Sequence, residues 1–211
     1  HGLLKVDFGI NIEGFIADTA LSFDLENNEE NKKLIEAAEK SLENAIEKIK
    51  GKDVTTSDIG KIINETIASK GFIPIINLSG HSIEKYDLHS GITIPNIDDK
   101  KNIKIKNGLY AIEPFTTTNQ GNGKVYDAKP SSIYELKQKK PIRGQIAREV
   151  LSFIEEEYKT LPFCSRWLVK KFGTKAIVGL NQLEKEGVLH HFSQLIETSH
   201  KKVAQAEHTI L

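Results

Sequence analysis

The chain has 211 residues, of which 38% are hydrophobic and 27% are charged, a composition that suits one large globular domain or one domain with an insertion. Lysine plus arginine and aspartate plus glutamate number 29 each, so the zero net charge offers no global attraction to nucleic acid or to a membrane. No apolar run of about 18 residues is present to span a membrane, and the single Cys164 excludes an internal disulfide and suits a reducing cytosol.

The first predicted element is a β-hairpin over residues 4–23. Apolar and polar residues alternate through its first half, which is the period of a half-buried strand. With Ile12 and Glu13 as the turn residues, Asp7 lies directly opposite Asp18 across the ladder. Opposed like charges destabilise a sheet, so the two aspartates either face solvent or hold a cation between them.

Two amphipathic helices are predicted next. The first starts near Asn28 and ends at Gly51, and the second runs from about Ser57 to Gly71. We expect both helices to cover a sheet, and we assign neither a catalytic role.

Four further polar residues lie close to apolar segments. His81 and His89 lie on predicted loops among glycine and serine, Glu113 lies in an apolar strand over Leu109–Phe115, and Glu207 lies in a strand-like run near the last residue. A glutamate in a buried strand is costly unless it is paired or coordinated. Taken alone, each of the four is at least as readily a surface residue as a site residue.

Between these two glutamates the pattern changes. Three short helices and a hairpin over about 188–203 predict a compact helical insert similar to a winged helix, which we place at 141–200 between the catalytic parts 1–140 and 201–211. Basic residues of the insert are interleaved with glutamates and show no aromatic–basic alternation. A solvated surface is therefore favoured over a nucleic-acid interface.

Five candidate residues offer the same ligand chemistry, carboxylate oxygen or imidazole nitrogen without thiolate: Asp7, Asp18, His81, Glu113 and Glu207. Such donors suit divalent Mn, Fe, Co or Zn and do not select among them. Four carboxylates that face one another would repel without cations, and two divalent ions would neutralise them. A two-metal site clamps the attacking and leaving oxygens of a displacement, so hydrolysis is the natural reaction class.

The order and spacing of these five residues resemble the methionine aminopeptidases, and their type 2 branch in particular. The stretches that carry the resemblance are Val6–Gly9, Ile12–Asp18, Asn77–Ile83, Tyr110–Glu113 and Ala206–Leu211. The insert, with Pro162–Leu168 inside it, resembles the insertion that separates type 2 from type 1. The resemblance implies an α/β (α+β) pita-bread fold, in which two pseudo-symmetric halves of antiparallel strands carry covering helices.

The resemblance also implies how such a site would work. Asp18 and Glu207 would bridge two divalent metal ions, Asp7 would chelate one of them, and His81 and Glu113 would bind the other. Glu113 would also take a proton from the attacking water, so that a metal-bound hydroxide attacks the first peptide carbonyl.

A substrate is implied as well. It would be the N-terminal initiator methionine of a nascent polypeptide whose second residue is small. His89 matches the position whose imidazole contacts the scissile peptide. The apolar pocket for the methionine side chain is expected to include Leu88, Ile133, Pro162 and Phe192.

The two ends of the chain depart from the resemblance. The sequence contains no methionine, opens within three residues of a strand and ends on a strand-like run. We interpret it as a fragment that lacks an N-terminal segment and the extreme C-terminus. The family has a further substrate-contacting histidine upstream of the first aspartate, on a segment that this sequence does not include.

Two alternatives to a methionine aminopeptidase stay open. An Xaa-Pro aminopeptidase or prolidase would cut X-Pro-Y rather than Met-Ala-X, and the Phe163–Trp167 stretch of the insert argues against it. A non-catalytic pita-bread protein that binds the ribosome or RNA would have lost metal ligands, whereas all five are present. Ribosome association beside catalysis is compatible with the substrate, and a cytoplasmic monomer without membrane contact fits the balanced charge.

Overall fold

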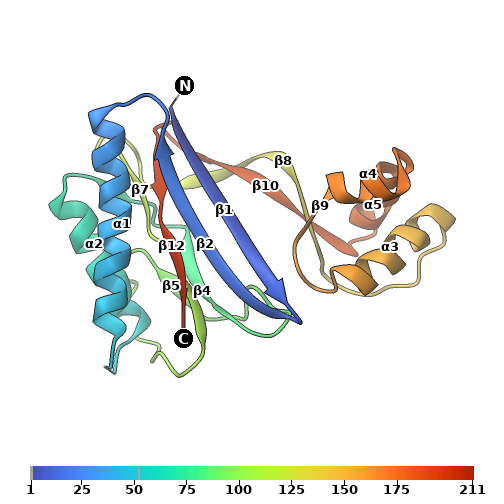
Figure 1. Cartoon of the computed structure of the whole chain (residues 1–211), viewed down its shortest axis with the longest axis horizontal. Helices are drawn as coiled ribbons and strands as arrows, with labels where there is room; N and C mark the ends of the chain where they lie inside the picture. Colours follow the sequence, from blue (N-terminus) through green and yellow to red (C-terminus); the bar gives the residue numbers. More distant parts are fainter. Residues whose placement is uncertain (1, 52) are drawn as a thin grey trace. The chain divides into compact units, whose positions relative to one another are not determined.

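The computed structural model describes residues 2–51 and 53–211, which form two compact units (Figure 1). Unit 1 comprises residues 1–126 and 196–211, and unit 2 comprises residues 127–195. The insert expected at 141–200 differs from unit 2 at both boundaries. Unit 2 starts earlier, since Tyr134 and Leu136 already belong to the apolar core of its helices, and it ends earlier, since the residues from Ile196 belong to unit 1. No helix in the described part of the chain has the length and apolarity needed to cross a membrane.

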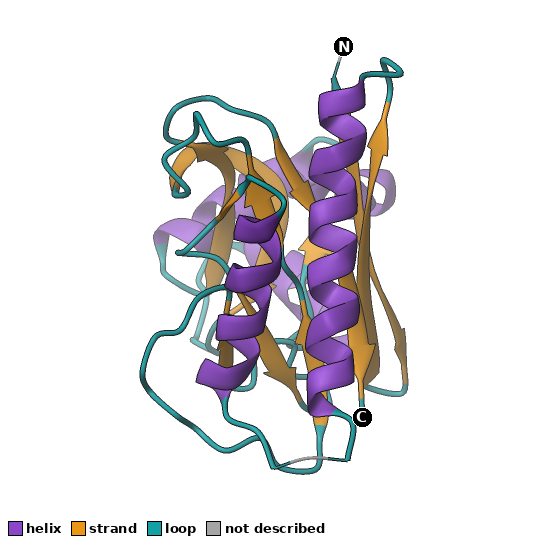
Figure 2. Ribbon diagram, turned by 90° about the vertical axis from the view of Figure 1, so that its left-hand side faces the viewer, coloured by secondary structure: helices purple, strands orange, loops and turns teal. Residues whose placement is uncertain are grey.

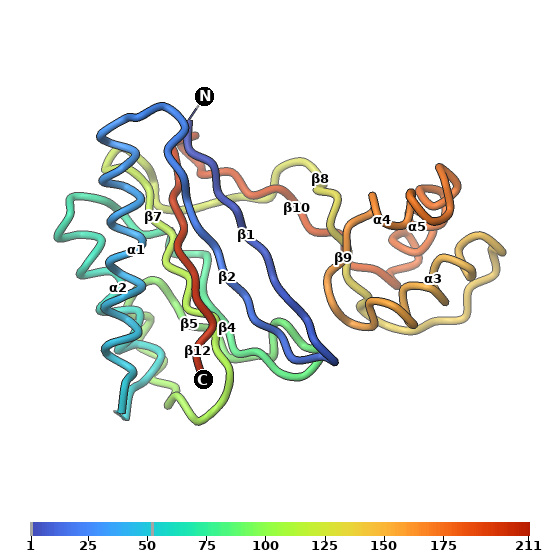
Figure 3. The backbone as a smooth tube through the Cα atoms, in the orientation of Figure 1, coloured from blue at the N-terminus to red at the C-terminus, as the bar shows by residue number. Residues whose placement is uncertain are grey.

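Unit 1 is built on a six-stranded antiparallel sheet. Its strands lie in the order β1 (Leu3–Ile12), β2 (Phe15–Asp24), β12 (Glu207–Ile210), β6 (Leu109–Ile112), β4 (Ser79–Ile83) and β5 (Thr93–Pro95). A second sheet contains β11 (Val203–Gln205), β7 (Phe115–Thr117) and β3 (Ile73–Pro74). The last strand, β12, lies beside β2 from the start of the chain, as the red and blue tubes of Figure 3 show.

Two segments of the chain pass from one sheet to the other. The strand expected over Leu109–Phe115 is divided into β6 and β7 at Glu113 and Pro114, and the final run is divided into β11 and β12 at Ala206. Pro114 has no N–H group for a ladder, and its carbonyl accepts a hydrogen bond from the Ala206 N–H at 3.3 Å. The two breaks therefore lie side by side, and each places a glutamate at a sheet boundary.

Two helices cover one face of the six-stranded sheet, as Figure 2 shows. The first, α1 (Glu29–Ile49), starts after Asn28, whose side chain caps it, and the second, α2 (Thr56–Ser69), starts with a capping box of Thr55 and Asp58. Their apolar faces pack on the central strands in a core that includes Ala45, Ile59, Ile63, Ile67, Tyr110 and Ile112. The opposite face of these strands is left for polar groups.

The hairpin of β1 and β2 has a different register from the expected one. Glu13 and Gly14 are the two central turn residues, with φ of 52° and 91°, and this pair of positive φ angles matches the twist of the strands. Asp7 consequently pairs with Ala20 rather than with Asp18. The expected direct opposition of the two aspartates is wrong. The turn needs two positive φ angles, and Gly14 adopts one of them without strain, whereas the expected turn would have required one of the β-branched Ile12.

The outer face of this hairpin is apolar and exposed. Eight large side chains that alternate with the aspartates are 39–70% exposed: Leu4, Val6, Phe8, Ile10, Ile12, Phe15, Leu21 and Phe23. Within unit 1, no described element covers this face. A contiguous apolar surface of this kind is typical of an interface with further polypeptide.

Unit 2 packs three helices against a small sheet. The helices α3 (Gln145–Glu157), α4 (Ser165–Phe172) and α5 (Lys175–Lys185) enclose a core with Phe163, Leu168, Leu180 and Leu183, and the strands are β10 (Leu189–Glu197), β8 (Val125–Leu136) and β9 (Phe163–Cys164). The hairpin expected over 188–203 is wrong. β10 lies beside β8, whereas β11 pairs with β7 in the other sheet.

One buried acid of unit 1, Glu197, has a purely structural setting. It is 3% exposed, and its carboxylate accepts hydrogen bonds from the N–H groups of Asn122 at 2.7 Å, Ser199 at 2.7 Å and Lys201 at 3.1 Å. Burial by itself would raise the pKa of Glu197, but these backbone donors together hold it below its usual range. The carboxylate thus joins two loops of the chain.

We expect Glu197→Gln to lower the free energy of unfolding by about 1–3 kcal/mol, because an amide cannot accept all of these bonds and leaves a buried N–H unpaired. Urea denaturation at pH 7 measures the change. Glu65→Gln, at an exposed position on α2, is the control and should alter stability by less than about 0.5 kcal/mol. Equal effects of the two substitutions would contradict the structural role of Glu197.

Candidate metal centre

The strand order places three of the four candidate carboxylates in one row across the sheet. Asp7 on β1 pairs with Ala20 on β2, and Ala20 pairs with Glu207 on β12. His208 pairs with Ile112 between β12 and β6, so the same register carried one residue further brings Glu113 next to Glu207. Paired residues project from the same face of a sheet, so three acids separated by up to 200 positions in sequence share one row.

A second row lies two residues along the strands, on the same face. In it Gly9 pairs with Asp18, while Thr209 pairs with Ala111 and Ala111 pairs with His81. Asp18 and Asp7 are therefore diagonal neighbours rather than directly opposed. The small side chains between the polar ones leave space above the sheet for a ligand.

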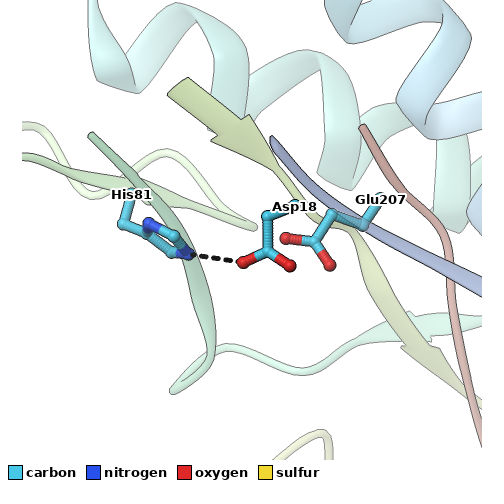
Figure 4. Close-up of side chains that lie close together, drawn as sticks. All are labelled: Asp18, His81 and Glu207. Carbon is cyan, nitrogen blue, oxygen red and sulfur yellow. Dashed lines mark ion pairs between the residues drawn. The ribbon is translucent and has the colours of Figure 1, made fainter. Parts of the chain in front are cut away.

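Three of these side chains converge closely (Figure 4). Asp18, His81 and Glu207 come from β2, β4 and β12, and each offers one ligand atom within 4.8 Å of the others. His81 Nε2 lies 3.9 Å from Asp18 Oδ2 and 3.5 Å from Glu113 Oε1. These distances are too long for strong hydrogen bonds, whereas they leave room for an ion between the atoms.

Burial and mutual repulsion shift the protonation of these acids strongly. Burial, with repulsion from Asp18 and Asp7, raises the pKa of Glu207 to about 9, and burial and the neighbouring acids raise that of Glu113 well above its usual range. Burial and Asp7 raise the pKa of Asp18 to about 6. Burial and then His89 lower the pKa of His81 to about 4, so its ring is neutral at pH 7. A neutral imidazole is the form that binds a metal.

The residues present fit divalent cations. Among the described residues, no lysine or arginine forms an ion pair with Asp18, Glu113 or Glu207, so the acids lack a protein counter-charge. Carboxylate oxygens and one imidazole nitrogen are donors that Mn, Fe, Co and Zn accept. A bound cation would supply the missing positive charge and favour the ionised acids.

Hydroxyl groups that sequence reasoning missed hold the two central acids in place. Thr209 Oγ1 accepts a hydrogen bond from the Asp18 N–H at 2.7 Å and donates one to the Asp18 carbonyl at 2.8 Å. Thr19 Oγ1 donates to the Glu207 carbonyl at 2.9 Å. Threonine is common in strands for its shape alone, so a threonine in a strand-like run does not by itself predict these hydrogen bonds.

The predicted substrate residues are divided between the two units. His89 is exposed on a loop of unit 1, and its ring centroid lies 4.4 Å from that of His81 in an edge-to-face contact; Leu88 is half-buried beside it. The other three lie in unit 2. Ile133 pairs with Cys164, Pro162 directly precedes β9, and the Phe192 ring contacts His190, so their part in a substrate pocket stays a prediction.

Solved structures with similar folds include pita-bread proteins. A thermophilic Arx1 superimposes with a TM-score of 0.77 at 14% identity, covering 98% of this chain and 63% of that one. A methionine aminopeptidase from Thermotoga maritima superimposes with a TM-score of 0.61 at 21% identity, covering 99% and 59%. At such identities these likenesses concern the fold alone, and they confirm the expected α/β pita-bread class.

Sequence comparison reaches further than the fold. Residues 1–161 match the metallopeptidase family M24. Curated methionine aminopeptidases of Thermococcus kodakarensis, Pyrococcus abyssi and Methanocaldococcus jannaschii are 40%, 43% and 41% identical over 99% of this chain, which spans 70%, 70% and 69% of their lengths. The chain therefore belongs to metallopeptidase family M24, within its methionine aminopeptidases, and is a hydrolase of the aminopeptidase class.

Proposed function

We propose that the chain removes the initiator methionine from nascent polypeptides with a small second residue, using two divalent metal ions. The observation that carries this proposal is the meeting of Asp7, Asp18, His81, Glu113 and Glu207 on one face of one sheet, in a chain about 40% identical to methionine aminopeptidases. Two divalent ions would balance the four negative charges of these ligands.

The proposed roles are those that the resemblance implies, and the place of each side chain supports them. Asp18 and Glu207 converge at the centre and would bind both ions, Asp7 at the edge strand would bind one, and His81 and Glu113 would bind the other. Bound divalent ions would polarise the peptide carbonyl and make water more acidic. Glu113 would accept the proton of that water, because its carboxylate lies 3.5 Å from the His81 ring and so beside the proposed ion.

The residues around this centre would define the substrate. His89, which contacts the His81 ring, would donate a hydrogen bond to the scissile peptide and stabilise its tetrahedral intermediate. Leu88, Ile133, Pro162 and Phe192 would enclose the methionine side chain. Because the proposed substrates emerge from ribosomes, the proposed place of action is the cytoplasm, with the protein acting as a monomer and near the ribosome.

Methionine release from synthetic peptides tests this function. We expect the protein with Mn²⁺ or Co²⁺ to release methionine from Met-Ala-Ser, to leave Met-Leu-Ser intact and to stop when a chelator is added. Cleavage of X-Pro-Y peptides instead would indicate an Xaa-Pro aminopeptidase or prolidase. Absence of release with every metal, together with chelator-resistant ribosome binding, would replace catalysis by a binding role.

A further inference from the structure

Asp7 differs from the other acids of the metal centre in its surroundings. Its strand, β1, is the edge of the sheet, and Asp7 is exposed, so packing does not fix its side chain. Among the described residues, one side-chain donor reaches its carboxylate: Gln205 Nε2 donates to Asp7 Oδ2 at 3.0 Å. Gln205 is only 3% exposed. A buried amide therefore holds an exposed carboxylate.

The backbone of Gln205 is itself held at a fixed position. Its N–H donates to Ser22 Oγ at 2.8 Å, and the Ser22 hydroxyl donates to its carbonyl at 2.7 Å. Gln205 also pairs with Phe115 between β11 and β7, directly before the chain crosses to the main sheet at Ala206. The amide thus extends from one sheet to a carboxylate on the other, two residues before Glu207.

We propose that Gln205 is a positioning residue that orients Asp7 for binding one of the two divalent ions. This inference rests on the proposed function, because it assigns Asp7 to a metal. A carboxylate has about four lone-pair sites, so one hydrogen bond to Oδ2 leaves both oxygens able to bind a cation. Because the hydrogen bond already fixes the rotamer of Asp7, metal binding no longer carries the entropy cost of ordering that side chain.

The chemistry of an amide suits this place. Four carboxylates already face the centre, and a neutral donor orients Asp7 without adding a fifth negative charge. A lysine there would orient Asp7 equally well, but its charge would compete with the metal. Outer hydrogen-bond partners of metal ligands commonly contribute 10–100-fold to metal affinity, which sets the expected size of the effect.

Calorimetric titration of the metal-free chain with Mn²⁺, with bound ion counted by electron paramagnetic resonance, tests the inference. Asp7→Asn identifies the binding step to which Asp7 contributes. We expect Gln205→Met, which keeps an unbranched side chain of similar length but removes the amide, to weaken that same step about 10–100-fold and to spare the other. Ser22→Ala, which frees the Gln205 backbone, should weaken the same step less.

The matched control is Asn44→Met, which removes a half-buried amide. The Asn44 amide donates to Thr66 Oγ1 between the helices α1 and α2, which cover the face of the sheet opposite to the acids. It should leave both binding steps unchanged. Gln205→Met in the Asp7→Asn background should cause no further loss. Unchanged binding in Gln205→Met and Ser22→Ala, or equal weakening of both steps, would overturn the inference while the metal centre stands. A wild-type chain that binds no Mn²⁺ would overturn the proposed function together with it.

Discussion

Glu113→Gln is expected to lower the rate of methionine release from Met-Ala-Ser by about 10²–10⁴-fold, the usual contribution of a general base. Glutamine keeps one oxygen that can bind a metal but cannot accept the proton of water. The Mn²⁺ affinity should therefore fall much less than turnover does. Steady-state kinetics and calorimetric titration of the same preparations measure the two losses side by side.

Glu84→Gln is the matched control for this prediction, since Glu84 follows β4 but is exposed and its backbone, not its carboxylate, pairs with Asp87. It should leave both turnover and metal affinity unchanged. If Glu113→Gln lost metal binding and turnover in the same proportion, Glu113 would act only as a ligand. The base would then have to be sought elsewhere in the centre.

The stability of the metal-free chain should fall steeply between pH 6.5 and pH 9. The pKa of Glu207 is raised to about 9, so over this range the folded chain keeps a proton that the unfolded chain has released. Stability decreases with pH wherever the folded state binds more protons. Over 2.5 pH units the loss from Glu207 alone is about 3 kcal/mol, and Glu113 adds to it.

Other shifted groups of unit 1 define the window for this measurement. The pKa of Asp18 is raised to about 6, so its effect, a loss of stability as pH rises, is nearly complete below pH 6.5. The pKa of His81 is lowered to about 4, so its effect, a gain of stability as pH rises, also lies mostly below pH 6.5. Lys5, whose pKa burial lowers, opposes the loss at the alkaline end. The difference between wild type and Glu207→Gln isolates the glutamate.

Urea denaturation in the presence of chelator, at pH 6.5, 7.5 and 9, measures this dependence. Glu207→Gln should remove about 3 kcal/mol of the fall, and Glu43→Gln, on the exposed face of α1, should not change it. Saturating Mn²⁺ should abolish the fall, because a cation stabilises the ionised acids. An equally steep fall in Glu207→Gln would show that the acid is not protonated in the folded chain.

Several elements of this protein could be predicted from sequence because local chemistry dominates them. The helices α1 and α2 lie where apolar spacing and, for α1, the start near Asn28 predict them, and the glycines at 51 and 71 follow their ends. The five candidate ligands were identified by residue type and spacing. They share one face because each lies on a strand or at its boundary in a single sheet.

The details that decide the chemistry depend on partners distant in sequence. The positive φ angles of the hairpin turn fall at Glu13 and Gly14, one residue later than expected. The partner of Asp7 is therefore Ala20 instead of Asp18, and Asp18 lies diagonal to Asp7. The breaks at Pro114 and Ala206 arise because two sheets meet there. Neither is visible in the alternation of a single strand.

By itself, the sequence predicted the candidate ligands and the two covering helices from residue type and periodicity, which act over a few neighbouring positions, and its resemblance to a known family implied the fold class. Tertiary structure alone decided which atoms meet: the 3.5 Å approach of His81 to Glu113, the hydroxyl of Thr209 on Asp18, and the amide of Gln205 on Asp7. Contacts across up to 198 positions depend on sheet order and register, and these are set by the packing of the whole unit.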